Sequence, residues 1–213
     1  MARITILGGT GYAGAHLVRE AASRGHQVTA WSRSAPVEPV PGVTYEQGDA
    51  LDASFARKAV AGADVVIEAM SPRGALAGGL RDVVVALAAA AREAGVRLGV
   101  IGGAGSLQVA PGGPRLLDGD FPEAFRAEAL ELTDVLDDLR RSPEALDWFF
   151  VSPAAGFGSY APGERTGRYR LGGDVLLADD EGRSELSGAD LAVAILDEVE
   201  RPAHHRARFT AAY

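Results

Sequence analysis

The first fourteen residues constrain this chain more than any other segment. Residues 3–7, Arg-Ile-Thr-Ile-Leu, form a short apolar and β-branched run that predicts a buried strand, and glycines follow as Gly8, Gly11 and Gly14. An amphipathic helical pattern comes next, with its apolar face beginning at Leu17. A strand, a glycine-rich turn and a helix in this order can hold a pyrophosphate at a helix N-terminus. The segment therefore predicts a dinucleotide-binding site.

Each of the three glycines has a physical role in that interpretation. Gly8 allows the tight turn after the strand, Gly11 lets the backbone approach the phosphates, and Gly14 lets the helix pack close to the strand. The alternative is a turn that is merely rich in glycine. The strand before it and the helix after it favour the dinucleotide site.

The composition excludes several classes of function. The chain has 213 residues, of which 47% are hydrophobic and 23% charged, and this suits one globular domain. A net charge of −8 argues against nucleic acid or an anionic membrane as a partner. The chain has no cysteine, and its four histidines lack ligand spacing with carboxylates, so we expect no metal site. With no bilayer-spanning apolar stretch and no room for a signal peptide, we expect a cytoplasmic protein. Its oligomeric state is left open between a monomer and a homodimer.

Strand-like and helix-like segments alternate along the rest of the chain. Further strands are expected at residues 26–31, 43–47, 65–70, 96–101 and 148–153, and helices at about 53–60, 76–94, 122–141 and 188–199. Beyond residue 154, short strand-like segments around 169–171, 175–177 and 208–210 alternate with turns. This alternation predicts an α/β, Rossmann-type, doubly wound parallel sheet with helices on both faces and the strand order 3-2-1-4-5-6. The single domain would span residues 1–213, with about 154–213 forming a small C-terminal part on the substrate side.

Several short motifs resemble one known group of proteins. They are the glycine turn at 8–14, Gly48-Asp49, Gly-Gly-Ala-Gly-Ser at 102–106, Ser152-Pro153-Ala154 and the segment 162–170. Together they resemble the atypical short-chain dehydrogenase/reductases. Within that group they are similar to the small NAD(P)H-binding proteins named as NADH-flavin reductases, relatives of the NmrA-like and biliverdin reductase B-type proteins. The resemblance covers essentially the whole chain, and it implies cofactor binding more specifically than any substrate.

The cofactor preference is expected to depend on the end of the second strand. Rossmann proteins bind the ribose 2′-hydroxyl of NAD there with a carboxylate, or accommodate the 2′-phosphate of NADP with an arginine. This chain has Arg33 at that point and no carboxylate before Glu38. A guanidinium suits a phosphate because it donates two parallel hydrogen bonds. We therefore expect NADP(H) to be preferred over NAD(H), although Arg33 could also be a solvated loop arginine.

The remaining predicted cofactor contacts follow from position and from the resemblance. The resemblance implies that Asp49 contacts the adenine edge, the alternative being a residue that caps its loop. Met70 and Pro153 are expected to line the nicotinamide pocket. Ser71, just after the fourth strand, is a weaker candidate than Ser106 for a polar residue near the nicotinamide. The complete predicted set comprises Gly8, Thr10, Gly11, Tyr12, Gly14, Arg33, Asp49, Ala69, Met70, Ser71, Gly103 and Pro153.

A conventional acid–base pair is missing from the sequence. Many short-chain dehydrogenases protonate the substrate with a tyrosine followed four residues later by a lysine. The only lysine here is Lys58, preceded four residues earlier by Ser54, and the helix after the fifth strand carries Phe125-Arg126 where relatives often have Tyr-Lys. Alcohol–ketone chemistry by that route is disfavoured. Reduction of a flavin or quinone can instead take its proton from solvent.

Other polar residues have two interpretations. Ser106, after the fifth strand, is the best candidate for a catalytic residue near the nicotinamide, or else it caps a loop. Glu68 lies in an apolar strand and either faces solvent near the strand end or is a buried carboxylate near the cofactor. Phe157, Tyr160 and Tyr169 could stack on a flat substrate or belong to the core.

Three functions remain possible from the sequence. The first is an NAD(P)H-dependent oxidoreductase that transfers a hydride to a planar acceptor such as a flavin or quinone. The second is a non-catalytic NADP-binding redox sensor that contacts a protein partner, as NmrA-like proteins do. The third is a biosynthetic reductase or epimerase with an unusual acid. The compact length, without an obvious extension for a protein partner, favours the first.

Overall fold

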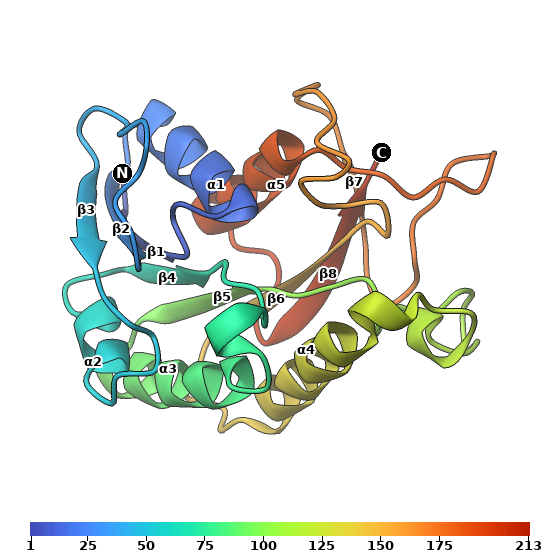
Figure 1. Cartoon of the computed structure of the whole chain (residues 1–213), viewed down its shortest axis with the longest axis horizontal. Coiled ribbons are helices and arrows are strands. Elements are labelled where there is room, and N and C mark those ends of the chain that lie inside the picture. Colours follow the sequence, from blue (N-terminus) through green and yellow to red (C-terminus); the bar gives the residue numbers. More distant parts are fainter.

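The computed structural model describes residues 1–213 and is built on one eight-stranded sheet (Figure 1). The strands are β1 (Arg3–Leu7), β2 (Gln27–Ser32), β3 (Thr44–Gln47), β4 (Val65–Glu68), β5 (Arg97–Ile101), β6 (Trp148–Pro153), β7 (Arg170–Gly172) and β8 (Ala207–Ala212). Their order is β3-β2-β1-β4-β5-β6-β8-β7, and only β7 runs antiparallel to its neighbour. The predicted Rossmann-type fold is confirmed, and β8 and β7 extend the predicted strand order.

Helices cover both faces of the sheet. On one face lie α1 (Tyr12–Ser23) and α5 (Gly188–Glu200), which pack against each other, and on the other lie α2 (Phe55–Val60), α3 (Leu80–Ala94) and α4 (Glu123–Arg141) (Figure 1). Two short 3₁₀ turns are η1 (Gly74–Leu76) and η2 (Leu116–Asp118). Each face buries its own apolar cluster, as expected for parallel strands covered on both sides. No helix combines the length and the apolar character needed to cross a bilayer.

Two expected elements differ from the observed ones. The helix expected at 76–94 is divided, because Gly78 has a positive φ of 72° and the regular helix begins only at Leu80. The strand-like segment at 175–177 makes one isolated bridge, between Val175 and Gln108, and forms no named strand.

Two glycines in and after β5 make room for aromatic rings from β6. A Cβ atom on Gly99 would lie 2.2 Å from the ring of Phe149, and one on Gly102 would lie 1.8 Å from the ring of Phe150. Both phenylalanines are fully buried, each in a different apolar cluster. The absence of a side chain at these two glycines therefore lets two phenylalanine rings of the neighbouring strand fill the core, one on each face of the sheet.

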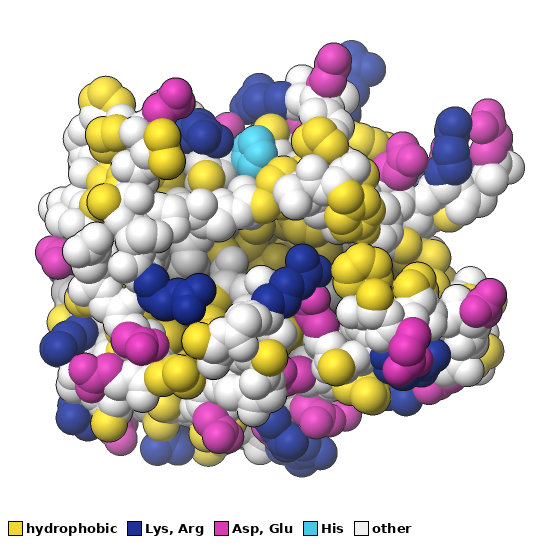
Figure 2. Space-filling model, in the orientation of Figure 1, with side chains coloured by type: hydrophobic (Ala, Val, Ile, Leu, Met, Phe, Trp, Pro, Cys, Tyr) yellow, Lys and Arg dark blue, Asp and Glu magenta, His cyan; other side chains and the backbone are white.

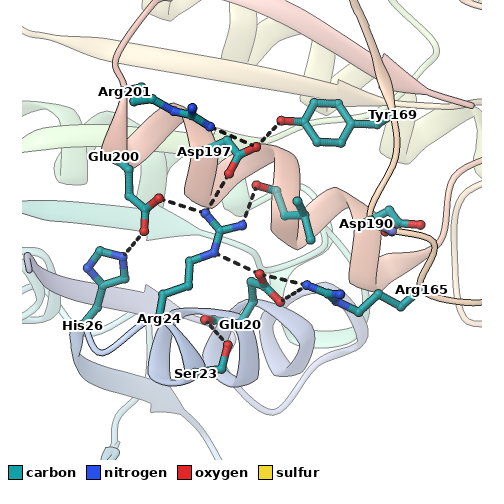
Figure 3. A network of polar contacts seen from close by, with 12 residues as sticks. Glu20, Ser23, Arg24, His26, Arg165, Tyr169, Asp190, Asp197, Glu200 and Arg201 are labelled. Atoms are coloured by element: carbon teal, nitrogen blue, oxygen red, sulfur yellow. Dashed lines mark hydrogen bonds and ion pairs between the residues drawn. The ribbon is translucent and has the colours of Figure 1, made fainter.

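A polar network joins α1, α5 and the loop 162–169 (Figure 3). The guanidinium of Arg24 donates from Nε to Glu20 at 2.9 Å and from Nη1 to Asp197 at 2.7 Å. The hydroxyl of Tyr169 donates to the other oxygen of Asp197 at 2.5 Å. Tyr169 is thus held in a structural network between helices.

The second anchor of that loop is Asp190, a buried carboxylate in the first turn of α5. It accepts hydrogen bonds from the N–H groups of Thr166 and Gly167 and from the hydroxyl of Tyr213. Burial alone would raise the pKa of Asp190, but these donors hold it below its usual value. Residues 162–170 therefore form a loop that Asp190 and Asp197 hold against α5.

Candidate functional site

The glycine-rich turn lies at the carboxyl end of β1 and opens directly into α1. Gly8 has a φ of +78°, and a Cβ atom on Gly14 would lie 2.1 Å from the carbonyl oxygen of Gly8. The first position requires a left-handed backbone and the second requires close helix–strand contact, so both need glycine. A Cβ atom on Gly11 would meet only the Gly8 carbonyl oxygen, at 3.2 Å, which leaves its other side open.

The start of α1 presents uncapped backbone donors. Gly11 is the N-cap, no side chain caps it, and the first turn contains no acidic residue. The N–H groups of Tyr12, Ala13 and Gly14 make no hydrogen bond within the chain. Free donors and the positive end of the helix dipole together favour an anion at this point.

A single cleft of about 820 Å³ runs from this turn across the carboxyl ends of the strands. Figure 2 shows a hollow with an apolar floor in the middle of the molecule and basic side chains near its edge. One end, the nucleotide end, is lined by the glycine turn, Trp31, Arg33, Ala50 and Phe55. The opposite end, for which we use the name acceptor end after the expectation from the sequence, is lined mainly by Arg73, Phe121, Phe125, Glu128, Phe157 and Tyr160.

The cleft lies where doubly wound sheets bind their ligands, and the sequence comparison agrees with this geometry. The profile of a family described as NAD(P)H-binding matches residues 8–202. The chain belongs to the NAD(P)H-binding family. The free donors at α1 and the uncovered approach at Gly11 fit the pyrophosphate of such a cofactor.

Relatives of this NAD(P)H-binding protein cover its whole length. It is 36% identical over 215 aligned positions to the uncharacterised protein YwnB of Bacillus subtilis strain 168, covering 98% of this chain and 97% of that one. A solved structure from Burkholderia pseudomallei, provisionally named an exported protein, is 43% identical with a TM-score of 0.88, and both chains are covered completely. A provisionally named NADH-flavin reductase from Streptococcus pneumoniae TIGR4 is 32% identical with a TM-score of 0.88, covering 100% of this chain and 99% of that one.

Most of the residues predicted for cofactor contact lie together in this cleft. They come from the ends of β1, β2, β4, β5 and β6, which the parallel sheet brings to one edge. The lining includes Gly8, Thr10, Gly11, Tyr12, Arg33, Ala69, Met70, Ser71, Gly103 and Pro153. Gly14 is buried beneath the turn and supports it without reaching the cleft surface.

Two residues at the nucleotide end differ in their surroundings. Arg33 is exposed on the rim, and its side chain makes no hydrogen bond or ion pair within the chain. Asp49 does not line the cleft, although Gly48 and Ala50 do. One oxygen of Asp49 accepts a hydrogen bond from the N–H of Leu51 at 3.0 Å, which is the loop-capping arrangement.

Tyr12 connects the two ends of the cleft. Its hydroxyl donates to the carbonyl of Pro162 at 3.1 Å and accepts from the N–H of Gly188 at 3.0 Å. Its ring also contacts Phe157, with centroids 5.5 Å apart. A residue of the first helical turn therefore positions the loop after β6.

Glu68 is fully buried, so the solvent-facing interpretation is wrong. It sits between Leu7 and Val100 in the register of the sheet, and one oxygen accepts from the N–H of Met70 at 2.6 Å while Oε2 has no partner. Burial raises the pKa of Glu68 to about 8, and the hydrogen bond from Met70 opposes this shift. The carboxyl group is therefore mostly protonated at pH 7, and it supports the backbone of a cleft residue.

Two residues suggested for catalysis or stacking lie away from the cleft. Ser106 does not line it, and its hydroxyl accepts a hydrogen bond from Nη1 of Arg208 at 2.9 Å. Tyr169 is held by Asp197 in the network between α1 and α5 (Figure 3). The groups that do lie at the acceptor end are Phe157 and Tyr160.

Sequence reasoning missed several residues of the lining. Trp31 and Phe55 form an edge-to-face pair, with centroids 5.4 Å apart, at the nucleotide end. Phe121, Phe125 and Arg73 belong to the acceptor end. The proximity of Trp31 to Arg33 in sequence was an available signal, but Arg73 and Phe121 lie on irregular segments whose direction no periodicity indicates.

No group of three or more histidine or carboxylate side chains lies close enough together to hold a metal ion. The charged side chains at the acceptor end are Arg73, Asp120 and Glu128. Phe125 occupies the cleft wall and offers no hydroxyl, while the guanidinium of the adjacent Arg126 donates to the carbonyl of Leu117.

Proposed function

We propose that this protein is an NADPH-dependent oxidoreductase that reduces a planar acceptor, a flavin or a quinone. The observation that carries the proposal is one continuous cleft with two dissimilar ends. The nucleotide end offers free backbone donors and Arg33, while the acceptor end offers aromatic rings and no tyrosine–lysine pair. Its volume of about 820 Å³ lies in the upper part of the range typical for cofactor sites.

The preference for NADPH rests on Arg33. An exposed guanidinium without a partner in the chain is available for two parallel hydrogen bonds to a 2′-phosphate. The neighbouring hydroxyl of Ser32 donates to the carbonyl of Ser34 and so shapes the turn that presents it. No carboxylate lines the nucleotide end, as binding of the free 2′-hydroxyl of NADH would require.

The redox step is balanced with the cofactor and acceptor alone. NADPH transfers a hydride to the quinone or flavin, one proton is taken from water, and the products are NADP⁺ and the hydroquinone or dihydroflavin. The chain supplies proximity and stacking in a largely apolar site. Met70 and Pro153 would contact the nicotinamide, and Phe157 and Tyr160, from the part of the chain after residue 153, would contact the acceptor.

The proposal is tested by measuring NADPH oxidation against a panel of flavins and quinones. We expect turnover with at least one planar acceptor, and a higher kcat/KM with NADPH than with NADH. Cofactor binding is measured separately by calorimetry. Tight NADPH binding without reduction of any acceptor would overturn the proposed enzymatic function and favour an NADP-binding redox sensor. A sharp pH optimum together with carbonyl reduction would favour a reductase with a dedicated acid.

A further inference from the structure

The acceptor end contains one cation whose terminal donors are unused, and we propose that Arg73 binds an anionic substituent of the planar acceptor. The natural acceptor would then be an aromatic ring system that carries a sulfonate, carboxylate or phosphate group. This inference rests on the proposed reductase function and narrows its substrate class.

Arg73 is fixed by one edge and free at the other. It lies between β4 and η1, and its Nε donates to Oε2 of Glu128 on α4 at 2.6 Å. Neither Nη1 nor Nη2 makes a hydrogen bond within the chain, and the side chain is 60% exposed. The ion pair therefore orients a guanidinium whose remaining donors can bind a second anion.

The same guanidinium stands beside an aromatic pair that suits a flat molecule. Its central carbon lies 5.7 Å from the ring centroid of Phe125, and the rings of Phe125 and Tyr160 are 6.3 Å apart at an interplanar angle of 23°. Insertion of a further ring between them needs about 7–8 Å, twice the usual carbon–carbon contact distance. Both residues are exposed, Phe125 to 39% and Tyr160 to 65%, so their side chains have room for a small outward movement.

The charge of the molecule makes such a residue necessary for an anionic ligand. The chain carries a net charge of −8, and the carboxylates of Asp120 and Glu128 also line the acceptor end. An acceptor anion would be repelled there without a local cation. Glu128 neutralises one edge of Arg73, so its removal should strengthen anion binding, whereas removal of Arg73 should abolish the preference.

The competing explanation is mechanical. The ion pair could serve only to fasten the segment before η1 to α4, in which case Arg73 would affect all acceptors equally. The probes that separate these explanations are 1,4-naphthoquinone and 1,4-naphthoquinone-2-sulfonate, which differ by one anionic group. Because the sulfonate also changes the reduction potential of the quinone, the quantity compared is the ratio of the two acceptors in each variant.

The experiment compares wild type with Arg73→Gln, Arg73→Lys and Glu128→Gln, using Arg92→Gln as the control. Arg92 is an exposed arginine in the last turn of α3, has no ion pair and does not line the cleft, so this control matches the change in charge. Two measurements are made on each protein: kcat/KM at saturating NADPH, and the Kd of each quinone by calorimetry in the presence of NADP⁺, where no reduction occurs.

We expect Arg73→Gln to lower the sulfonate-to-neutral ratio by about tenfold to a hundredfold, the effect of losing a hydrogen bond to a charged group. Arg73→Lys should retain part of the preference, Glu128→Gln should increase it, and Arg92→Gln should leave it unchanged. An unchanged sulfonate-to-neutral ratio in Arg73→Gln, with or without a fall in stability, would overturn the proposal. Arg73 would then only fasten the segment before η1 to α4. If neither quinone is reduced, the Kd ratio alone decides the role of Arg73, and the wider panel of flavins and quinones decides the reductase function.

Discussion

The two ends of the cleft are formed by different parts of the chain, the backbone at one end and side chains at the other. The nucleotide end depends on backbone geometry: a left-handed Gly8, a Gly14 with no room for a side chain, and free N–H groups at the start of α1. The acceptor end depends on side chains such as Arg73, Phe125 and Tyr160, which come from segments that are far apart in the sequence. Backbone sites accept few substitutions, whereas a wall of side chains can change its ligand without changing the fold.

The largest expected effect tests the backbone end. Gly11→Val should lower NADPH affinity by at least about a hundredfold, because the side chain fills the space where the helix donors meet the pyrophosphate. The fold should survive, since φ at Gly11 is −74° and a Cβ there meets only one atom, at 3.2 Å. Calorimetry and thermal unfolding measure the two properties.

The matched variant for that test is Gly14→Ala. Its Cβ would lie 2.1 Å from a backbone carbonyl oxygen, so here we expect lost stability as well as lost binding. Normal NADPH binding by Gly11→Val would place the phosphate site elsewhere and remove the basis of the comparison.

The next effect concerns Glu68, beneath the middle of the cleft. Its pKa is about 8 in the folded protein and near 4.5 when unfolded, so in this range the folded state binds the extra proton. The free energy of unfolding should therefore fall as the pH rises from 4.5 to 8, by about 1.4 kcal/mol per pH unit at most. Urea unfolding across this range should show a flatter profile in Glu68→Gln than in wild type. Identical slopes would mean that Glu68 does not titrate in that window.

A smaller effect sharpens the cofactor preference. Arg33→Ala should weaken NADPH binding by about 1.5–3 kcal/mol, the range for a hydrogen bond to a charged group, and leave NADH binding nearly unchanged. Arg57→Ala, an exposed arginine on α2 outside the cleft, controls for the change in charge. Equal losses of affinity for NADPH and NADH would show that Arg33 does not bind the 2′-phosphate.

The smallest expected effect separates a structural role of Ser106 from a catalytic one. Ser106→Ala should cost about 1 kcal/mol of stability, because Arg208 loses a hydrogen-bond acceptor, and should change turnover by less than about twofold. Arg208 remains paired with Asp174 in this variant, which limits the damage. A loss of turnover of tenfold or more at unchanged stability would instead support a catalytic role for Ser106.

The sequence could predict the nucleotide end because its determinants are local. Gly8, Gly11 and Gly14 lie within one turn and identify strand, turn and helix together. The acceptor end was harder to predict from the sequence, because the direction of the Phe125 or Arg73 side chain depends on how distant segments pack together. Ser106 illustrates the difficulty: its partner Arg208 lies 102 positions further along the chain, on β8.

Errors at element ends have the same origin. Glu68 ends an apolar strand, where the alternation of residue types does not reveal whether other segments cover the strand end. The helix expected from residue 76 begins at Leu80, because its apolar pattern continues through glycines that the backbone uses to turn. Periodicity identifies elements well, but burial and termination at their ends are set by tertiary contacts.

The interlocking of β5 with β6 has a consequence for how this sequence can diverge. A methyl group at position 102 and a phenyl ring at position 150 exclude each other, and the same holds for positions 99 and 149. We therefore expect the two residues of each pair to change together, because a larger residue at one site needs a smaller one at the other. Since Gly102 also lines the cleft, a substitution made to reshape the pocket floor must be matched by one in the core.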